Sequence, residues 1–106
     1  MNLKNFFSNI PDKLSDEIIE TVFKSDSIRI ERIISQGQSS PENFWYNQPE
    51  NEWVIVLEGK AMIRFEDKSI VTLHKGDYLF IPAFTKHRVE WTDPNQLTIW
   101  LAIFFK

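Results

Sequence analysis

The sequence of 106 residues contains no cysteine. This absence excludes disulfide bonds, thiolate nucleophiles and cysteine-based zinc sites, and it is compatible with a reducing cytoplasm. Positive charge is also scarce, because 12 lysines and arginines stand against 15 aspartates and glutamates and leave a net charge of -3. A protein without a basic field is not expected to bind nucleic acid.

Long hydrophobic runs are missing as well. No stretch approaches the roughly 18 apolar residues of a membrane span, and the segment from Met1 to Phe7 lacks the basic region and apolar run of a signal peptide. We therefore expect no membrane partner and a cytoplasmic location. The composition is 42% hydrophobic and 14% aromatic, which at this length is typical of one packed domain with one core.

The first 26 residues are expected to form an N-terminal arm that carries a short helix. Between Leu14 and Phe23 the apolar residues fall at helical spacing, and Ser15 is placed as the N-cap. Pro11 and the cluster at residues 25–27 bracket this helix. The sequence therefore predicts two parts, an arm over residues 1–26 and a β-barrel domain over residues 27–106.

After Ser27 the pattern changes from helical spacing to alternating or continuously apolar runs that are separated by turn residues. Eight short strands separated by such turns are typical of an all-β barrel or sandwich. The predicted strands are Ile28 to Ser35, Asn43 to Asn47, Glu52 to Leu57, Lys60 to Glu66, Ser69 to Leu73, Tyr78 to Ile81, His87 to Thr92 and Leu97 to Phe104.

The segment from Leu97 to Phe105 is apolar on both faces, so both faces should be buried. It is either a central strand covered by the N-terminal helix or a surface buried by a second subunit. This segment and the arm residues Phe6 and Phe7 together expose more hydrophobic surface than a monomer of this size normally covers. We therefore expect a homodimer.

Glu52 and His87 stand at the centre of the one candidate working site. Glu52 begins a predicted strand and lies seven residues before a turn glycine, Gly59. His87 begins another strand, after a run in which Gly76 is followed by Pro82 with five residues between them. These two runs resemble the paired motifs of the cupin superfamily over roughly residues 28–104. The resemblance implies a small β-barrel of the jelly-roll type, with Glu52 and His87 as metal ligands.

The chain departs from the cupin pattern at four positions. Tyr46 and Gln48 stand where cupins usually carry a His-x-His pair. Phe84 replaces a usual glycine, and Trp91 occupies the position of the final asparagine. The first change implies weaker metal binding than a three-histidine site, and the second implies a bulkier and more apolar pocket rim.

Residues i and i+2 of a strand point to the same face, so Tyr46 and Gln48 would present two oxygens toward Glu52 and His87. An imidazole nitrogen with carboxylate and amide oxygens suits a divalent ion such as Mn, Fe, Ni or Zn. The first hypothesis is a metal site of Gln48, Glu52 and His87, with Tyr46 and His87 as catalytic groups that act on a small polar molecule. The resemblance implies dioxygenase, isomerase or decarboxylase chemistry.

Three alternatives stay open. Glu52 and His87 could be paired only with each other. The protein could be a metal-free binding module for a small molecule, or an isomerase that works without metal through proton transfer by His87 and Tyr46. Arg64 and Arg88 could hold an anionic substrate at the barrel mouth. The predicted pocket residues are Trp45, Phe84, Arg88 and Trp91.

Overall fold

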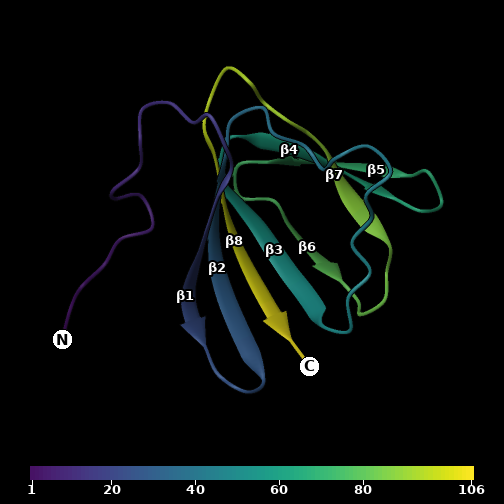
Figure 1. Cartoon of the computed structure of the whole chain (residues 1–106), viewed down its shortest axis with the longest axis horizontal. Helices are drawn as coiled ribbons and strands as arrows, with labels where there is room; N and C mark the ends of the chain where they lie inside the picture. Colours follow the sequence, from purple (N-terminus) through teal and green to yellow (C-terminus); the bar gives the residue numbers. More distant parts are fainter.

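Eight strands form two antiparallel sheets that face each other in the computed structural model, which describes all 106 residues (Figure 1). The larger sheet has the strand order β1 (Ile18–Lys24), β2 (Ile28–Ser35), β8 (Thr98–Phe105), β3 (Asn51–Glu58) and β6 (Tyr78–Ile81). The smaller sheet has the order β5 (Ile70–His74), β4 (Lys60–Phe65) and β7 (His87–Thr92). The predicted all-β barrel is confirmed. No helix is present that could cross a membrane.

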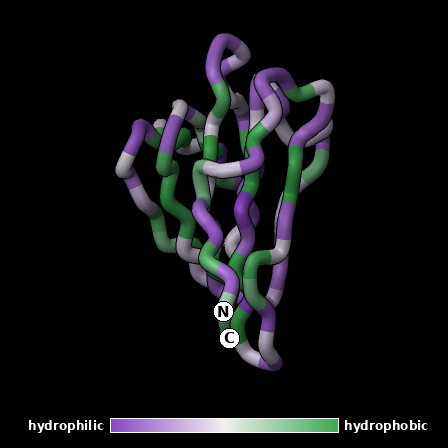
Figure 2. Tube along the Cα trace, turned by 90° about the vertical axis from the view of Figure 1, so that its left-hand side faces the viewer, coloured by the Kyte–Doolittle hydropathy of each residue, from purple (hydrophilic) through white to green (hydrophobic).

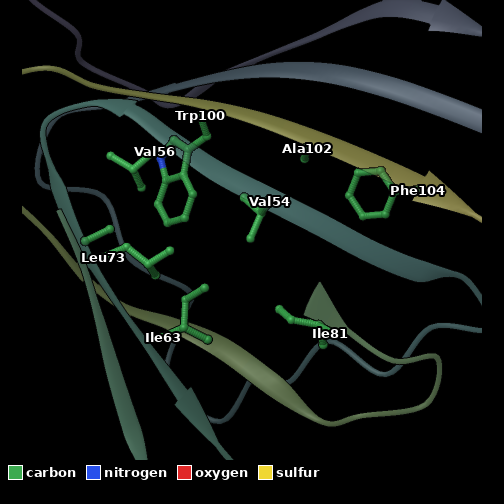
Figure 3. Close-up of a cluster of buried hydrophobic side chains, with 9 residues drawn as sticks. Val54, Val56, Ile63, Leu73, Ile81, Trp100, Ala102 and Phe104 are labelled. Carbon is green, nitrogen blue, oxygen red and sulfur yellow. The ribbon is translucent and has the colours of Figure 1, made fainter. Parts of the chain in front are cut away.

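The hydrophobic core lies between the two sheets. Alternate residues of a strand point to opposite faces, so Trp100, Ala102 and Phe104 of β8 face inward together. Figure 3 shows these side chains opposite Ile63 of β4. Full burial of one aliphatic side chain contributes about 1.5 to 3 kcal/mol to folding. The core residues are Val54, Val56, Ala61, Ile63, Leu73, Ile81, Trp100, Ala102 and Phe104.

Gly59 forms the corner at which the chain passes from β3 in the larger sheet to β4 in the smaller one. Its φ is +92°, and a Cβ atom at this position would lie 2.6 Å from the Cα atom of Thr98. Only glycine combines this backbone conformation with such a close approach. Next to it, the Lys60 amide donates to the Thr98 hydroxyl oxygen at 3.2 Å. The corner therefore holds the start of β4 against β8.

The predicted strands agree closely with the observed ones, with one exception. The strands β2, β6 and β7 have the predicted bounds, and β3, β4, β5 and β8 differ by at most one residue at each end. The predicted strand from Asn43 to Asn47 is wrong, because this segment makes only an isolated bridge between Tyr46 and His87. Asn43 has a φ of 65°, in the left-handed region, and Phe44 donates to the Pro41 carbonyl in a turn.

The predicted N-terminal helix is also wrong. Residues 18–24 form β1, which pairs with β2 along the edge of the larger sheet. Four of the seven residues in β1 are β-branched, which favours a strand over a helix. The open edge of β2 also supplies backbone hydrogen-bond partners for a strand, whereas a short helix without tertiary packing is only marginally stable in water. The division of the chain at residue 26 stays a prediction, although β1 is hydrogen-bonded to the sheet of the barrel.

The last strand, β8, is central, between β2 and β3. The interpretation of this segment as a central strand is therefore right, but the N-terminal helix that was expected to cover it is absent. Arg29 of β2 pairs with the inward residue Phe104. Ile30 pairs with Ile103, which is on the outer face. The alternation in the first half of β2 is thus inverted, with Arg29 and Glu31 toward the barrel interior and isoleucine outside, whereas Ile33 further along faces inward. Figure 2 shows the apolar stretches along the strands.

Candidate functional site

A cavity of about 190 Å³ lies between the two sheets, inside the barrel. It is walled by inward side chains of β2, β3, β7 and β8 and by the loop before β3. Hydrophobic residues, several of them from the core, make up much of its wall, and charged and polar residues make up the rest. The lining residues are Glu17, Ile19, Arg29, Glu31, Ile33, Tyr46, Gln48, Glu52, Val54, Ile63, His87, Val89, Trp100 and Phe104.

His87 is the first residue of β7 and is only 5% exposed. Its Nδ1 atom lies 2.8 Å from the carbonyl oxygen of Thr85, an acceptor, so Nδ1 carries a proton that it donates there. The other ring nitrogen, Nε2, faces the cavity at 3.3 Å from Oε1 of Glu52. The loop before β7 therefore fixes the ring orientation and leaves Nε2 for chemistry.

The protonation of His87 depends on two opposing effects. Burial lowers the pKa of His87, because it penalises the charged ring. The hydrogen bond to Glu52, the bond to the Thr85 carbonyl and the negative charge of Glu52 act against burial and together raise the pKa above its ordinary value of 6.5. The imidazolium and the Glu52 carboxylate thus stabilise each other in the absence of a ligand.

Tyr46 lies in the loop before β3 and is tied to His87 by two backbone hydrogen bonds. The amide of Tyr46 donates to the His87 carbonyl at 2.7 Å, and the amide of His87 donates back at 3.2 Å. Their rings stack with centroids 5.4 Å apart. Burial and the nearby charges of Glu17, Glu52 and Glu31 raise the pKa of the Tyr46 phenol. Tyr46 therefore stays protonated and acts in the cavity as a hydrogen-bond donor.

Gln48 completes the group around Glu52. Its side-chain amide donates to Oε1 of Glu52 at 3.3 Å, the same oxygen that His87 contacts. The carbonyl of Gln48 accepts a hydrogen bond from the Phe84 amide at 2.8 Å, which joins the loop before β3 to the loop before β7. Side chains from separate segments of the chain therefore meet at one carboxylate oxygen.

This geometry can be tested against the needs of a divalent ion. Two ligand atoms bound at about 2.1 Å and separated by a tetrahedral angle lie about 3.4 Å apart, close to the two 3.3 Å separations at Glu52. The hydrogen bond from His87 Nδ1 to Thr85 is also the outer contact that orients a metal-binding histidine. No group of three His, Cys, Asp or Glu residues is present, so the donor set fits an ion only if the Gln48 amide oxygen turns toward it.

The four residues predicted to line the pocket lie outside the cavity. Arg88 follows the inward residue His87, so it points outward on the smaller sheet, where its guanidinium lies 3.3 Å from Glu90. Trp91 lies opposite Met62 on the same outer face. Phe84 is 69% exposed, and Trp45 also faces away from the interior. Arg64 pairs with Glu90 at 3.0 Å and does not reach the barrel mouth.

The charged residues that β2 and the arm contribute to the cavity were not predicted from the sequence. Arg29 and Glu31 line the cavity because the alternation in β2 is inverted. Glu17 reaches the cavity from the segment just before β1, where its carboxylate accepts a hydrogen bond from Ser35 at 2.9 Å. Burial raises the pKa of Glu17, although the Ser35 bond opposes the shift. The only signal in the sequence was the regular spacing of Arg29 and Glu31 in β2. This spacing is equally typical of a strand face exposed to solvent, so it did not identify these residues as part of a site.

A barrel of two antiparallel sheets, with a cavity into which β3 and β7 place Glu52 and His87, is the architecture from which the class of protein follows. The model of the cupin domain matches residues 31–104. The chain therefore belongs to the cupin family, and the predicted resemblance to a small single-domain cupin is confirmed. No curated protein matches the sequence.

Three solved structures illustrate the likeness. A candidate mannose-6-phosphate isomerase from Ralstonia eutropha JMP134 is 41% identical, with a TM-score of 0.94 over 100% of this chain and 99% of that chain. A cupin superfamily protein from Desulfitobacterium hafniense DCB-2 is 20% identical, with a TM-score of 0.75 over 91% and 83% of the two chains. A protein from Thermus thermophilus is 18% identical, with a TM-score of 0.80 over 99% and 97%. The last two show the fold alone.

Proposed function

We propose that this cupin binds one divalent metal ion through Gln48, Glu52 and His87 and converts a small polar molecule in the adjoining cavity. The observation that carries the proposal is the convergence of Gln48 and His87 on one oxygen of Glu52, at 3.3 Å each. The 41% identical structure described as a candidate mannose-6-phosphate isomerase supports an isomerase class of reaction. Tyr46 is the fourth polar group of the site.

The metal ion, Tyr46 and Glu17 have separate roles in the proposed reaction. A bound ion of this type would act as a Lewis acid on a carbonyl or hydroxyl oxygen of the substrate. Tyr46 keeps its proton, since burial and the surrounding carboxylates raise its pKa, and it can pass that proton only to a substrate oxygen that has become strongly basic. Glu17 has a raised pKa for a carboxyl group and lines the same cavity, so it is placed to accept a proton from substrate. Isomerisation needs both an acceptor and a donor of protons.

The test is metal binding by the purified full chain. We expect Mn, Fe, Ni or Zn to bind near one ion per chain, and we expect His87→Ala to lose the ion because it removes the only imidazole of the set. Glu66→Gln is the matched control, since Glu66 pairs with Lys86 outside the cavity. Full metal retention by His87→Ala would sink the assignment.

A metal-free site is the second candidate, and one observation favours it. Glu52 and His87 already satisfy each other as an ion pair, and the raised pKa of His87 favours the charged ring, which cannot bind metal. In that case the protein is a small-molecule binding module, or an isomerase that uses His87 and Tyr46 as proton carriers. Thermal stabilisation by organic ligands but by none of the four metals would select this candidate.

We also propose a homodimer, formed through the outer face of the larger sheet. The inverted alternation of β2 puts Ile28 and Ile30 on this face beside Ile103. Phe80 on β6 is 51% exposed and stacks on Phe105 of β8 at 6.2 Å. A second copy is the occupant that we favour, because a shared apolar face is complementary to itself about a twofold axis.

The surface area supports the same assembly. The chain exposes 6922 Å², whereas a folded monomer of this mass exposes roughly 6200 Å². The surplus is close to the roughly 800 Å² that one partner buries in a standard interface. The N-terminal residues, which extend away from the barrel in Figure 1, contribute to this exposed area.

A further inference from the structure

We infer that the ligand of the cavity is a small molecule with hydroxyl or amine groups and without an anionic group. The inference rests on the proposed function, because it names the chemical class that the same cavity accepts. It separates this chain from the sugar phosphate in the description of its 41% identical structural neighbour. The charged groups that face the cavity, and the partners that each of them already has, determine which ligands can bind.

The cavity is lined by three carboxylates, those of Glu17, Glu31 and Glu52, and by one permanent cation, Arg29. A divalent ion held at Glu52 would neutralise the surplus of two negative charges but would leave no net positive charge. An anionic ligand would therefore enter a cavity whose walls carry like charges, which disfavours binding.

Arg29 is not free to compensate an anion. Its Nε atom lies 3.0 Å from Glu31, and its Nη1 atom contacts both oxygens of Glu50 at 3.2 Å. The guanidinium also lies over the ring of Phe104, 4.2 Å from the centroid. The contacts with Glu31 and Glu50 direct the guanidinium to two protein carboxylates, so a phosphate at Arg29 would lie close to two negative charges and compete with them.

Other anchors for a phosphate are absent from the cavity wall. No lysine lines it, and Arg64 and Arg88 are paired with Glu90 on the outside of the smaller sheet. The fold contains no helix, so no helix N-terminus points at the site, although such ends are common phosphate anchors. A phosphate monoester, with a charge of about -1.5 to -2 at neutral pH, would meet only Arg29 and a protonated His87 as cations, and each of them already lies beside a protein carboxylate.

The remaining features suit a small polar ligand. The Tyr46 phenol is a donor, and the carboxylates of Glu17 and Glu52 are acceptors, which together match hydroxyl and amine groups. Trp100 and Phe104 supply apolar walls. The volume of about 190 Å³ is below the roughly 300 to 1,000 Å³ of most ligand pockets, so the ligand has few atoms.

The experiment compares matched sets of probes. One set is glycerol, 3-amino-1,2-propanediol and glycerol 3-phosphate, and the other is mannose, mannosamine and mannose 6-phosphate. Binding to the full chain is followed by the NMR resonance of the Trp100 indole N–H, which donates to Ser35 beside the cavity. Each titration is run with and without Zn²⁺, and Zn²⁺ binding itself is followed separately at the ring of His87.

We expect the hydroxyl or amine members to shift the indole resonance and the phosphate members to bind at least about tenfold more weakly. Tighter binding of a phosphate member than of its parent would overturn the inference. So would a failure of every uncharged and amine probe to shift the resonance at millimolar concentration while Zn²⁺ still binds at His87. Absence of Zn²⁺ binding at His87 contradicts the proposed metal site instead. The inference about the ligand is then judged from the titrations without Zn²⁺, which compare the neutral and amine probes with the phosphate probes.

A variant ties the preference to the carboxylates. Glu31→Gln removes one negative charge and frees Arg29 from its shortest ion pair, so we expect the discrimination against phosphate to fall severalfold. Glu66→Gln, which changes a carboxylate outside the cavity, should leave the discrimination unchanged. Equal discrimination by Glu31→Gln and the unaltered protein would show that the cavity charges do not select the ligand.

Discussion

The Nε2 atom of His87 lies 3.3 Å from Oε1 of Glu52, and the opposite ring nitrogen is committed to the carbonyl of Thr85. Nε2 is thus the ring nitrogen that can bind the Glu52 carboxylate, a metal ion or a ligand. These uses compete, because a protonated Nε2 has no lone pair to offer a metal. The balance between them is measurable through the titration of His87.

Glu52→Gln should lower the pKa of His87. The change removes the negative charge that works against burial, and burial alone lowers the pKa of a histidine. The NMR titration of the His87 ring measures the shift directly. Glu66→Gln should leave the His87 titration where it is, and an unchanged titration in Glu52→Gln would mean that Glu52 does not support the charged ring.

The same ion pair predicts how stability varies with pH. The folded pKa of His87 is raised above 6.5, so its contribution to stability is fully present below the unfolded pKa and is lost as pH rises through the folded pKa. Urea unfolding should therefore show a larger loss of stability in His87→Phe at acidic pH than at alkaline pH. A loss that is equal on both sides of this window would assign the effect to packing.

Glu17→Gln should stabilise the protein at neutral pH. The pKa of Glu17 is raised by burial above its ordinary 4.5, so this carboxylate destabilises the fold once the pH exceeds the folded pKa, and the amide has no such penalty. Denaturation at pH values below 4.5 should show little difference from the unaltered protein. Greater stability of the unaltered protein at neutral pH would show that the charged carboxylate is stabilised by its contacts.

Gly59→Ala should destabilise the fold more than Gly76→Ala, although both glycines have nearly the same positive φ. A Cβ at Gly76 meets nothing within 4 Å, so only the backbone strain of about 1 to 2 kcal/mol applies. A Cβ at Gly59 also collides with Thr98, which adds about 1 to 3 kcal/mol for overpacking. Urea unfolding compares the two, and equal losses would remove the steric argument.

Phe80→Glu should convert the homodimer to a monomer, because it places a charge on the outer face of the larger sheet where Phe80 stacks on Phe105. Ile70→Glu is the matched control, since Ile70 is 46% exposed on β5 of the other sheet. Sedimentation or light scattering at micromolar concentration reports the mass. A monomeric mass of the unaltered protein would contradict the proposed assembly.

The barrel was largely predictable from the sequence because its signals are local. Alternating apolar runs and turn residues placed seven of the strands within a residue of their observed bounds. The segment before them was not predictable in the same way, because the apolar residues of β1 fit either period. The decision between helix and strand came from β2, a partner that is found only in the folded chain.

The candidate site was predictable in its centre and not in its walls. The motif spacing singled out Glu52 and His87, and the structure brings them together. Arg88 was expected in the pocket as an anchor for an anionic substrate and Trp91 from its position in the cupin motif, but strand alternation and a bulge turn them outward. Glu31 was not predicted at the site, because nothing in the sequence indicates that β2 places Arg29 and Glu31 toward the interior.

The loops that carry Tyr46, Gln48 and His87 are joined by their main chains, through the Tyr46–His87 bridge and the bond from Phe84 to Gln48. These main-chain hydrogen bonds hold the two loops together, so the side chains of Tyr46, Gln48 and His87 have fixed relative positions. A ligand that enters the barrel meets groups whose spacing is already set, so little conformational freedom remains to be lost on binding. For the same reason, exchanging one of these side chains should alter the chemistry of the cavity without displacing its neighbours.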